Sequence, residues 1–112
     1  MGWTEKLDEM KGNLRTLNAA APEATKAFQG LGKAAKTGQA LDTKTIEFIA
    51  LGIAVADRCE PCIMFHTQAL IKLGCTREEF SDALGICIQM GGGPSLMYSA
   101  KAIDCFDELS AA

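Results

Sequence analysis

Cys59, Cys62 and His66 stand close enough in the sequence to share one chemical task. Their spacing places all three on one face of a helix that begins near Cys59. Pro61 suits the first turn of such a helix, because the amide N–H it lacks has no helical partner there. The unpaired N–H groups and the dipole at this end stabilise a thiolate. With His66, the only histidine, one turn further on, the pattern predicts a redox-active dithiol with its own proton-handling partner.

Zinc binding is the competing interpretation of the same three side chains. A structural zinc site needs four ligands, so the fourth would have to come from Glu47 or Cys75. Three ligands crowded onto one helix make a poor tetrahedron. This geometry favours the redox interpretation over a metal-binding module.

Glu47 is the one charged residue in an otherwise apolar run from Ile46 to Ala56. It could lie in solvent and simply favour the start of a helix through the dipole. If it is buried, it needs a partner, because an unpaired carboxylate inside a protein is strongly destabilising or becomes neutralised. In that case Glu47 would orient His66 or share a proton with it, completing a set of nucleophile, base and orienting group.

The elements that must position these residues are helices. Apolar residues recur at three- and four-residue spacing, and no stretch alternates as a strand would. Cap and proline signals predict six helices, which begin at Thr4, Pro22, Asp42 or Thr43, Glu60, Thr76 and Pro94. The sequence therefore predicts an all-α fold of about six helices, in a single domain spanning residues 1–112.

The predicted helices also have predicted inward faces. The third helix is apolar nearly all round, so we expect it to be buried on every side. In the second helix an apolar stripe is formed by Phe28, Leu31 and Ala35. In the sixth helix we expect the inward residues to be Leu96, Met97, Ala100, Ile103 and Phe106.

Composition and charge exclude several functions. The net charge is −3 and no basic block occurs, so the chain has no electrostatic footprint for nucleic acid. No apolar run reaches the roughly 18 residues of a membrane span, and the N-terminus does not resemble a signal peptide. We therefore expect a cytoplasmic protein that binds neither nucleic acid nor membrane.

The cysteine count supports a chemical role for one pair. Five cysteines in a chain without an export signal do not indicate a framework of structural disulfides. In a reducing compartment a Cys-x-x-Cys pair is catalytic or binds a metal, whereas Cys75, Cys87 and Cys105 stand isolated in apolar context. We expect Cys59 and Cys62 to form a reversible disulfide and the other three cysteines to stay reduced.

The pattern Glu47-x11-Cys59-x2-Cys62-x3-His66 resembles the signature of the carboxymuconolactone decarboxylase superfamily, on its alkyl hydroperoxidase D (AhpD)-like branch. The similarity covers roughly residues 22–110. Three further stretches resemble the family: Leu41–Lys44, Leu73–Glu79 and Gly91–Pro94. Where the best-known AhpD sequences carry a second histidine, directly before the second cysteine, this chain has Pro61.

The resemblance implies an all-helical bundle and a thiol-dependent peroxidase or disulfide reductase. It implies that Cys62 is the peroxidatic thiol, His66 its activating base, Glu47 the relay carboxylate and Cys59 the resolving thiol. True carboxymuconolactone decarboxylases resemble this fold but lack the cysteine pair. The cysteine pair thus favours peroxide reduction, and decarboxylation of a small organic acid is the alternative that the shared fold implies.

The resemblance also implies partners. The oxidant would be a peroxide or another small molecule. No cofactor would be bound, and electrons would come from an external dithiol, lipoyl- or thioredoxin-like, carried by a donor protein. AhpD-like proteins assemble around three-fold axes with the dithiol near subunit boundaries, so a homo-trimer or homo-hexamer is implied. The apolar third helix independently favours association, because a small bundle cannot cover it on all sides.

Overall fold

The computed structural model describes residues 2–38 and 40–111, which form α-helices and no strand. The helices are α1 (Trp3–Ala20), α2 (Pro22–Ala35), α3 (Thr43–Ala56), α4 (Glu60–Lys72), α5 (Arg77–Gly91) and α6 (Gly93–Ala111). The predicted all-α fold of six helices is confirmed. None of the described helices combines the length and the apolar character that crossing a lipid bilayer requires.

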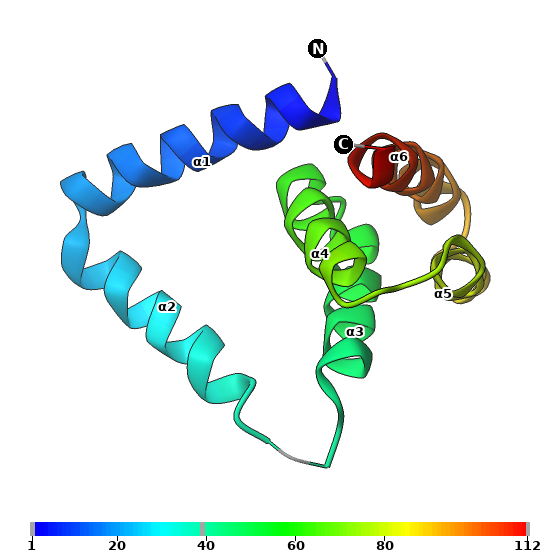
Figure 1. Cartoon of the computed structure of the whole chain (residues 1–112), viewed down its shortest axis with the longest axis horizontal. Helices are drawn as coiled ribbons and strands as arrows, with labels where there is room; N and C mark the ends of the chain where they lie inside the picture. Colours follow the sequence, from blue (N-terminus) through cyan, green and yellow to red (C-terminus); the bar gives the residue numbers. More distant parts are fainter. Residues whose placement is uncertain (1, 39, 112) are drawn as a thin grey trace.

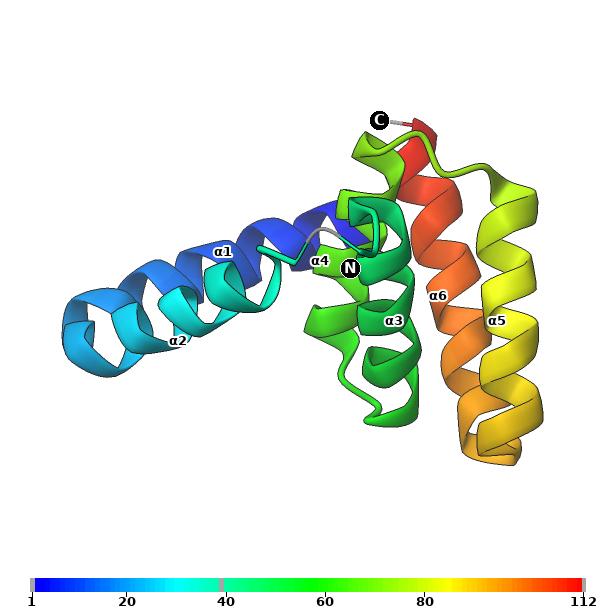
Figure 2. The same cartoon turned by 90° about the horizontal axis from the view of Figure 1, so that it is seen from below.

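Helices α3 to α6 form a four-helix body, and α1 and α2 form an arm that extends away from it (Figures 1 and 2). Within the body, α3 packs along α4 and α5 along α6, and α4 also packs on α6. The arm is attached through α1, where Trp3 and Leu7 pack with Met64 of α4 and Cys105 of α6. In contrast, α2 packs only on α1 and buries none of its residues.

The core of the body fixes α3 against α4. Its fully buried members include Leu51 and Val55 of α3, Ile63 and Leu70 of α4, and Phe80 of α5. Burial of each such side chain stabilises the fold by about 1.5–3 kcal/mol. Because α3 carries Glu47 and α4 carries the Cys-x-x-Cys-x3-His motif, this core also sets the geometry of the candidate site.

Local hydrogen bonds explain where several helices begin and end. The Asp42 carboxylate accepts a 2.8 Å hydrogen bond from the Thr45 amide and caps α3. Thr76 and Glu79 form a capping box at the start of α5, as predicted. Gly74 follows α4 with φ of +80°, a left-handed conformation that glycine adopts without steric cost.

Two predicted helix starts are wrong by one or two residues. Helix α1 begins at Trp3 with Gly2 as its N-cap, instead of being capped by Thr4. The Thr4 amide donates a 2.8 Å hydrogen bond to the Glu108 carboxylate of α6, so a distant side chain caps the first turn. Helix α6 begins at Gly93, one residue before Pro94.

The predicted inward face of α6 is largely wrong. Leu96 and Met97 are 47% and 63% exposed, and Ala100 is also exposed. The buried residues of α6 are Ser95, Ser99, Ala102, Cys105 and Phe106. Of the predicted residues only Phe106 is buried, because small serine and alanine side chains allow α6 to pack closely on the body.

Two other predicted apolar faces are exposed. Helix α3 buries Leu51 and Val55, but Ile49 and Ile53 on its other side are 51% and 57% exposed. The α2 stripe faces solvent, since Phe28 is 74% exposed. These faces remain uncovered because the arm packs away from α3, and one copy of the chain has no other element to place on them.

Candidate active site

A tight turn between α3 and α4 places the first cysteine. Only residues 57–59 separate the two helices. The Arg58 and Cys59 amides donate to the carbonyls of Val55 and Ala54, at 3.1 and 3.0 Å, in the pattern of a Schellman motif. Arg58 takes the left-handed position with φ of 56°, which glycine usually fills. The turn thus reverses the chain within three residues and brings Cys59 back beside the last turns of α3.

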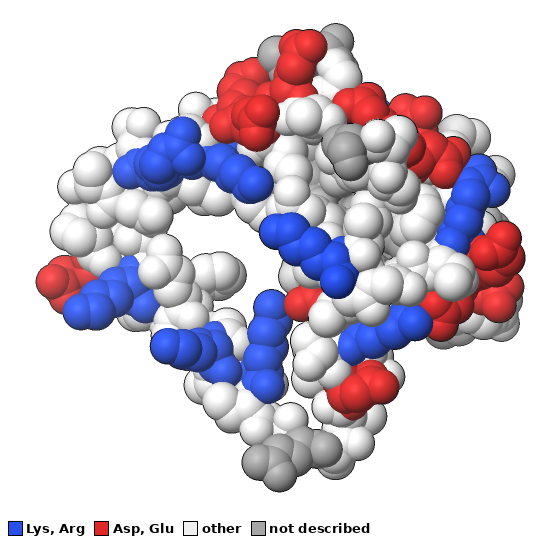
Figure 3. Space-filling view, viewed as in Figure 1, with Lys and Arg blue, Asp and Glu red and all other residues white. Residues whose placement is uncertain are grey.

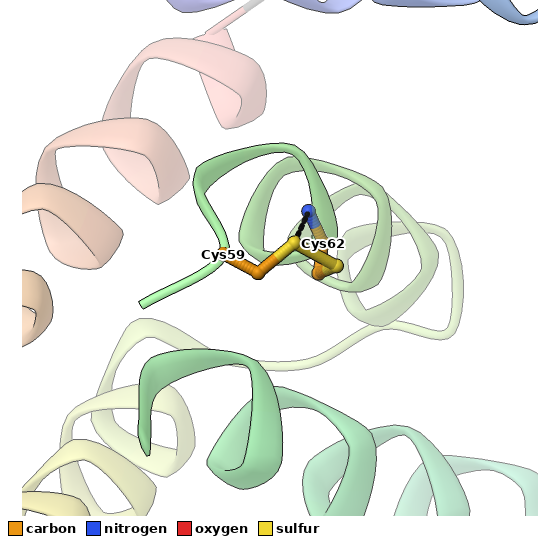
Figure 4. The surroundings of a disulfide bond; sticks show 2 residues. All are labelled: Cys59 and Cys62. Carbon is orange, nitrogen blue, oxygen red and sulfur yellow. Dashed lines mark hydrogen bonds between the residues drawn. A yellow bond between two sulfur atoms is a disulfide. The ribbon is translucent and has the colours of Figure 1, made fainter. Parts of the chain in front are cut away.

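Cys59 is the N-cap of α4, and its sulfur accepts a 3.3 Å hydrogen bond from the Cys62 amide (Figure 4). Pro61 lies in the first helical turn, as predicted. A disulfide joins Cys59 and Cys62 in the structure, which matches the expected pairing. Since the amide points at the cysteine sulfur, the same hydrogen bond can stabilise a thiolate when the pair is reduced.

The other three cysteines are free and unsuited to nucleophilic chemistry. Cys75 and Cys105 are buried, and Cys87 is half-buried. Burial raises the pKa of the Cys75 and Cys87 thiols and raises that of Cys105 to about 12. These thiols stay protonated at neutral pH, so the sequence expectation of small apolar side chains agrees with their surroundings.

Glu47 is buried, with its side chain 5% exposed, and both of its carboxylate oxygens are engaged. Oε2 lies 2.6 Å from Nδ1 of His66 on α4. Oε1 lies 3.1 Å from Nζ of Lys36, the residue that caps the C-terminus of α2. The buried interpretation of Glu47 is therefore confirmed, and its expected contact with His66 is present.

The charges around Glu47 determine which nitrogen of His66 carries a proton. Burial opposes ionisation of Glu47, but hydrogen bonds from His66 and Lys36 outweigh it and hold the pKa of this carboxyl below its ordinary value. An ionised carboxylate can only accept hydrogen bonds, so Nδ1 of His66 must be the donor. In a neutral ring, Nε2 is then the nitrogen that is free to take up a proton.

The dithiol and His66 line one hollow of about 240 Å³. Its other walls come from α3 and the turn: Ala50, Ile53, Ala54 and Asp57. A small molecule entering this hollow meets both sulfurs and the imidazole on largely apolar walls. The arrangement can activate a thiolate, transfer a proton to a leaving oxygen and close a disulfide.

The structure brings together the four residues that the sequence singles out, Glu47, Cys59, Cys62 and His66, on facing turns of α3 and α4. The zinc interpretation needs at least three converging His, Cys, Asp or Glu side chains, and no such group that could hold a metal ion occurs within residues 2–38 and 40–111. Cys75, one candidate for a fourth ligand, instead donates to the Thr76 carbonyl.

Two contacts of the site were not predicted. Lys36 reaches Glu47 from the end of a helix whose sequence shows only an apolar stripe, and no motif marks this lysine. Glu60, inside the Cys-x-x-Cys motif, bonds to Lys6 of α1 at 3.1 Å and to Lys101 of α6 at 3.3 Å. These bonds attach the first turn of α4 to two neighbouring helices, but only weakly, because all three side chains are partly exposed.

Two solved structures with the same fold are described as members of one family. The chain superimposes with a TM-score of 0.91 on a carboxymuconolactone decarboxylase family protein from Legionella pneumophila, at 44% identity and 96% coverage of both chains. A family member from Thermotoga maritima, described with a possible involvement in an antioxidative response, gives a TM-score of 0.83 at 28% identity, covering 95% of this chain and 91% of its own.

Sequence comparisons agree with the structural ones. An uncharacterised protein of Cupriavidus necator is 41% identical over 106 residues, which cover 95% of this chain and 94% of the relative. An uncharacterised protein of Haemophilus influenzae is 36% identical over 104 residues, with 93% and 92% covered. Residues 22–104 match the carboxymuconolactone decarboxylase family itself. On this match and on the shared fold, the chain belongs to the carboxymuconolactone decarboxylase family.

Proposed function

We propose that this chain is a thiol-dependent peroxidase or disulfide reductase that uses Cys59 and Cys62 as its redox pair and Glu47 and His66 as its proton relay. The observation that carries the proposal is the 2.6 Å contact between the buried Glu47 and His66, because His66 lines the same hollow as the cysteine pair. Family membership and the antioxidative description of the Thermotoga relative fit a role in antioxidant defence.

The catalytic cycle begins at Cys62. Its thiolate attacks the distal oxygen of a hydroperoxide, so that an S–O bond forms, the O–O bond breaks, and Cys62 becomes a sulfenic acid. His66 first takes the proton of the Cys62 thiol at Nε2 and then gives it to the leaving alkoxide, while Glu47 stabilises the imidazolium that exists between these two transfers. We assign attack to Cys62 because His66 follows it by one helical turn on α4.

Cys59 completes the oxidative half of the cycle. Its thiolate attacks the sulfenic sulfur, water leaves, and the disulfide observed in the structure results. An external dithiol, lipoyl- or thioredoxin-like, then reduces the pair through a mixed disulfide and is itself oxidised to a disulfide. As the N-cap sulfur that accepts the Cys62 amide hydrogen, Cys59 is stabilised as a thiolate both as the attacking group and as the leaving group.

The first test is oxidation of the reduced protein with hydrogen peroxide and with an organic hydroperoxide. We expect the loss of two thiols, recovery of both with a dithiol, and a bridge between Cys59 and Cys62 by mass mapping. The rate should exceed that of a free thiol such as glutathione at the same pH, because the site supplies a stabilised thiolate and a proton donor.

The matched control is Cys87→Ser, which removes a half-buried thiol outside the dithiol hollow. This variant should be oxidised like the wild type. A bridge that includes Cys75, Cys87 or Cys105, or a rate no higher than that of glutathione, would contradict the proposed peroxidase. A chain indifferent to peroxide that consumes a small carboxylic acid would instead point to decarboxylation.

We also propose that the chain assembles as a homo-trimer or homo-hexamer. Several apolar side chains are exposed on the arm and on the faces of α3 and α5: Leu17, Phe28, Leu31, Ile49, Ile53, Ile86 and Met90. Those on α3 and α5 line an apolar groove of about 340 Å³. Contiguous apolar surface of this kind favours association, and closed symmetry is its usual outcome.

Light scattering coupled to size exclusion measures the assembly directly. We expect a mass of three or six times the 11.9 kDa of one chain at micromolar concentration. Replacement of Ile53 by glutamate, at a 57% exposed position, should reduce the mass. A wild-type mass near 11.9 kDa would contradict this proposal.

A further inference from the structure

Glu47 has a partner beyond the relay. The carboxylate divides its oxygens between two donors, with Oε2 on His66 and Oε1 on Lys36 at 3.1 Å. The Glu47 side chain is 5% exposed and the Lys36 side chain 50% exposed, so the lysine closes the carboxylate from the solvent side. His66 comes from α4 of the body, whereas Lys36 comes from the arm.

Among residues 2–38 and 40–111, this ion pair is the one polar side-chain link between the end of the arm and the body. Helix α2 packs on α1 alone, and its hydrogen bonds through Thr25 and Thr37 are local. Among the described residues, no other side chain from position 21 to 38 forms a salt bridge. Figure 3 shows basic side chains gathered around the opening between the arm and the body. Of these basic side chains, it is Lys36 at the end of the arm that forms an ion pair with the buried Glu47 carboxylate.

We propose that Lys36 is a positioning residue of the redox site, which keeps Glu47 ionised and turned so that Oε2 faces Nδ1 of His66. The inference rests on the proposed function for its catalytic meaning. Lys36 touches neither sulfur and acts only through Glu47. The arm thereby becomes part of the active site, although none of its residues lines the hollow.

The charged groups around Glu47 determine in which direction its pKa shifts when Lys36 is removed. Lys36 and His66 are its hydrogen-bonding partners, and Lys44 on α3 pairs instead with Glu79. No charged side chain of α5 or α6 pairs with Glu47 among the described residues. Loss of Lys36 removes a positive charge from a buried carboxylate that burial already disfavours, so the pKa of Glu47 must rise. The carboxyl then keeps its proton to higher pH and stops orienting the imidazole.

Three variants test the inference. Lys36→Gln removes the charge, Lys36→Arg keeps it, and Lys33→Gln removes a charge one turn earlier on the same helix from a side chain without a salt bridge to any described residue. The single histidine gives unambiguous ring resonances in the NMR spectrum of the oxidised protein. These resonances report protonation of the coupled Glu47–His66 pair without any turnover.

We expect the acid midpoint of the pair to move to higher pH in Lys36→Gln and to stay in place in Lys36→Arg and Lys33→Gln. In the reduced protein, Lys36→Gln should slow peroxide oxidation about 10-fold at the acid end of the titration and recover to within about 2-fold of wild type at its alkaline end, because Glu47 without Lys36 ionises only at higher pH. A purely structural role would slow the reaction equally at both pH values.

Two results would overturn the inference: an unchanged midpoint in Lys36→Gln, or an equal shift in Lys33→Gln. The NMR titration keeps this decision separate from the proposed function. If the wild type fails to react with peroxide, the peroxidase proposal fails, while the titration still shows whether Lys36 holds Glu47 ionised.

Discussion

We expect the Cys62→Ser variant to lose catalysed peroxide turnover, whereas Cys59→Ser should still react once. Without Cys62, no thiolate stands one helical turn from His66 on the face of α4. Serine has nearly the same size, so the helix and its first turn are kept. The measurement is peroxide consumption with an excess of dithiol, and the expected residual rate is that of an unactivated thiol.

In Cys59→Ser we expect a sulfenic acid to accumulate on Cys62, because no resolving sulfur remains at the N-cap. A sulfenic-acid trap such as dimedone followed by mass spectrometry locates it. Cys87→Ser serves again as the control, with normal turnover and no trapped sulfenic acid.

Because Cys59 is the N-cap of α4, it could react with peroxide before Cys62, and this opposite order can be tested. The Cys59 sulfur accepts the Cys62 amide hydrogen, so Cys59 also has a stabilised thiolate. If Cys59 were the thiol that reacts first with peroxide, dimedone would label Cys59 in the Cys62→Ser protein, and the Cys59→Ser protein would be inert. That outcome would exchange the two roles and leave Glu47 and His66 in place.

The active-site motif was predictable because its geometry is local. Cys59, Pro61, Cys62 and His66 lie within two turns of one helix, and helical spacing fixes their shared face. Glu47 was predictable for a different reason: a lone carboxylate in an apolar helix needs a partner, and His66 is the partner it finds.

Lys36 and the inward face of α6 were not predictable, because both depend on packing between distant elements. Nothing near Lys36 in the sequence indicates that the arm returns its end to α3. In α6, the larger Leu96 and Met97 suggested an inward stripe, yet Ser95 and Ser99 are buried instead. Small residues suit close helix contacts as well as solvent, so their types do not fix the phase of the helix.

Glu47→Gln is expected to slow dithiol oxidation about 10- to 10⁴-fold, where the upper limit is the full contribution of a general acid–base group. The amide keeps the size of the side chain but loses the charge that makes Nδ1 of His66 the donor. It also leaves Lys36 without its anion. Both effects reduce the ability of Nε2 to exchange a proton with the thiol and the leaving oxygen.

The matched control is Glu60→Gln, which removes another salt-bridged carboxylate, between Cys59 and Pro61, without touching His66. Its effect should stay within about 3-fold, as is usual for partly exposed ion pairs. A comparable loss in both variants would show that general electrostatics near the dithiol, and not the relay, sets the rate.

The pH dependence separates catalysis by Glu47 from a structural role. Since His66 and Lys36 hold the pKa of Glu47 below its ordinary value despite burial, the carboxylate is ionised at neutral pH and takes up a proton only in acid. The wild-type rate should therefore fall on acidification below that pKa, and this part of the decline should disappear in Glu47→Gln. A rate constant and acid profile unchanged by the substitution would leave Glu47 with a helix-start role only, and would also remove the catalytic reason for Lys36 to reach it.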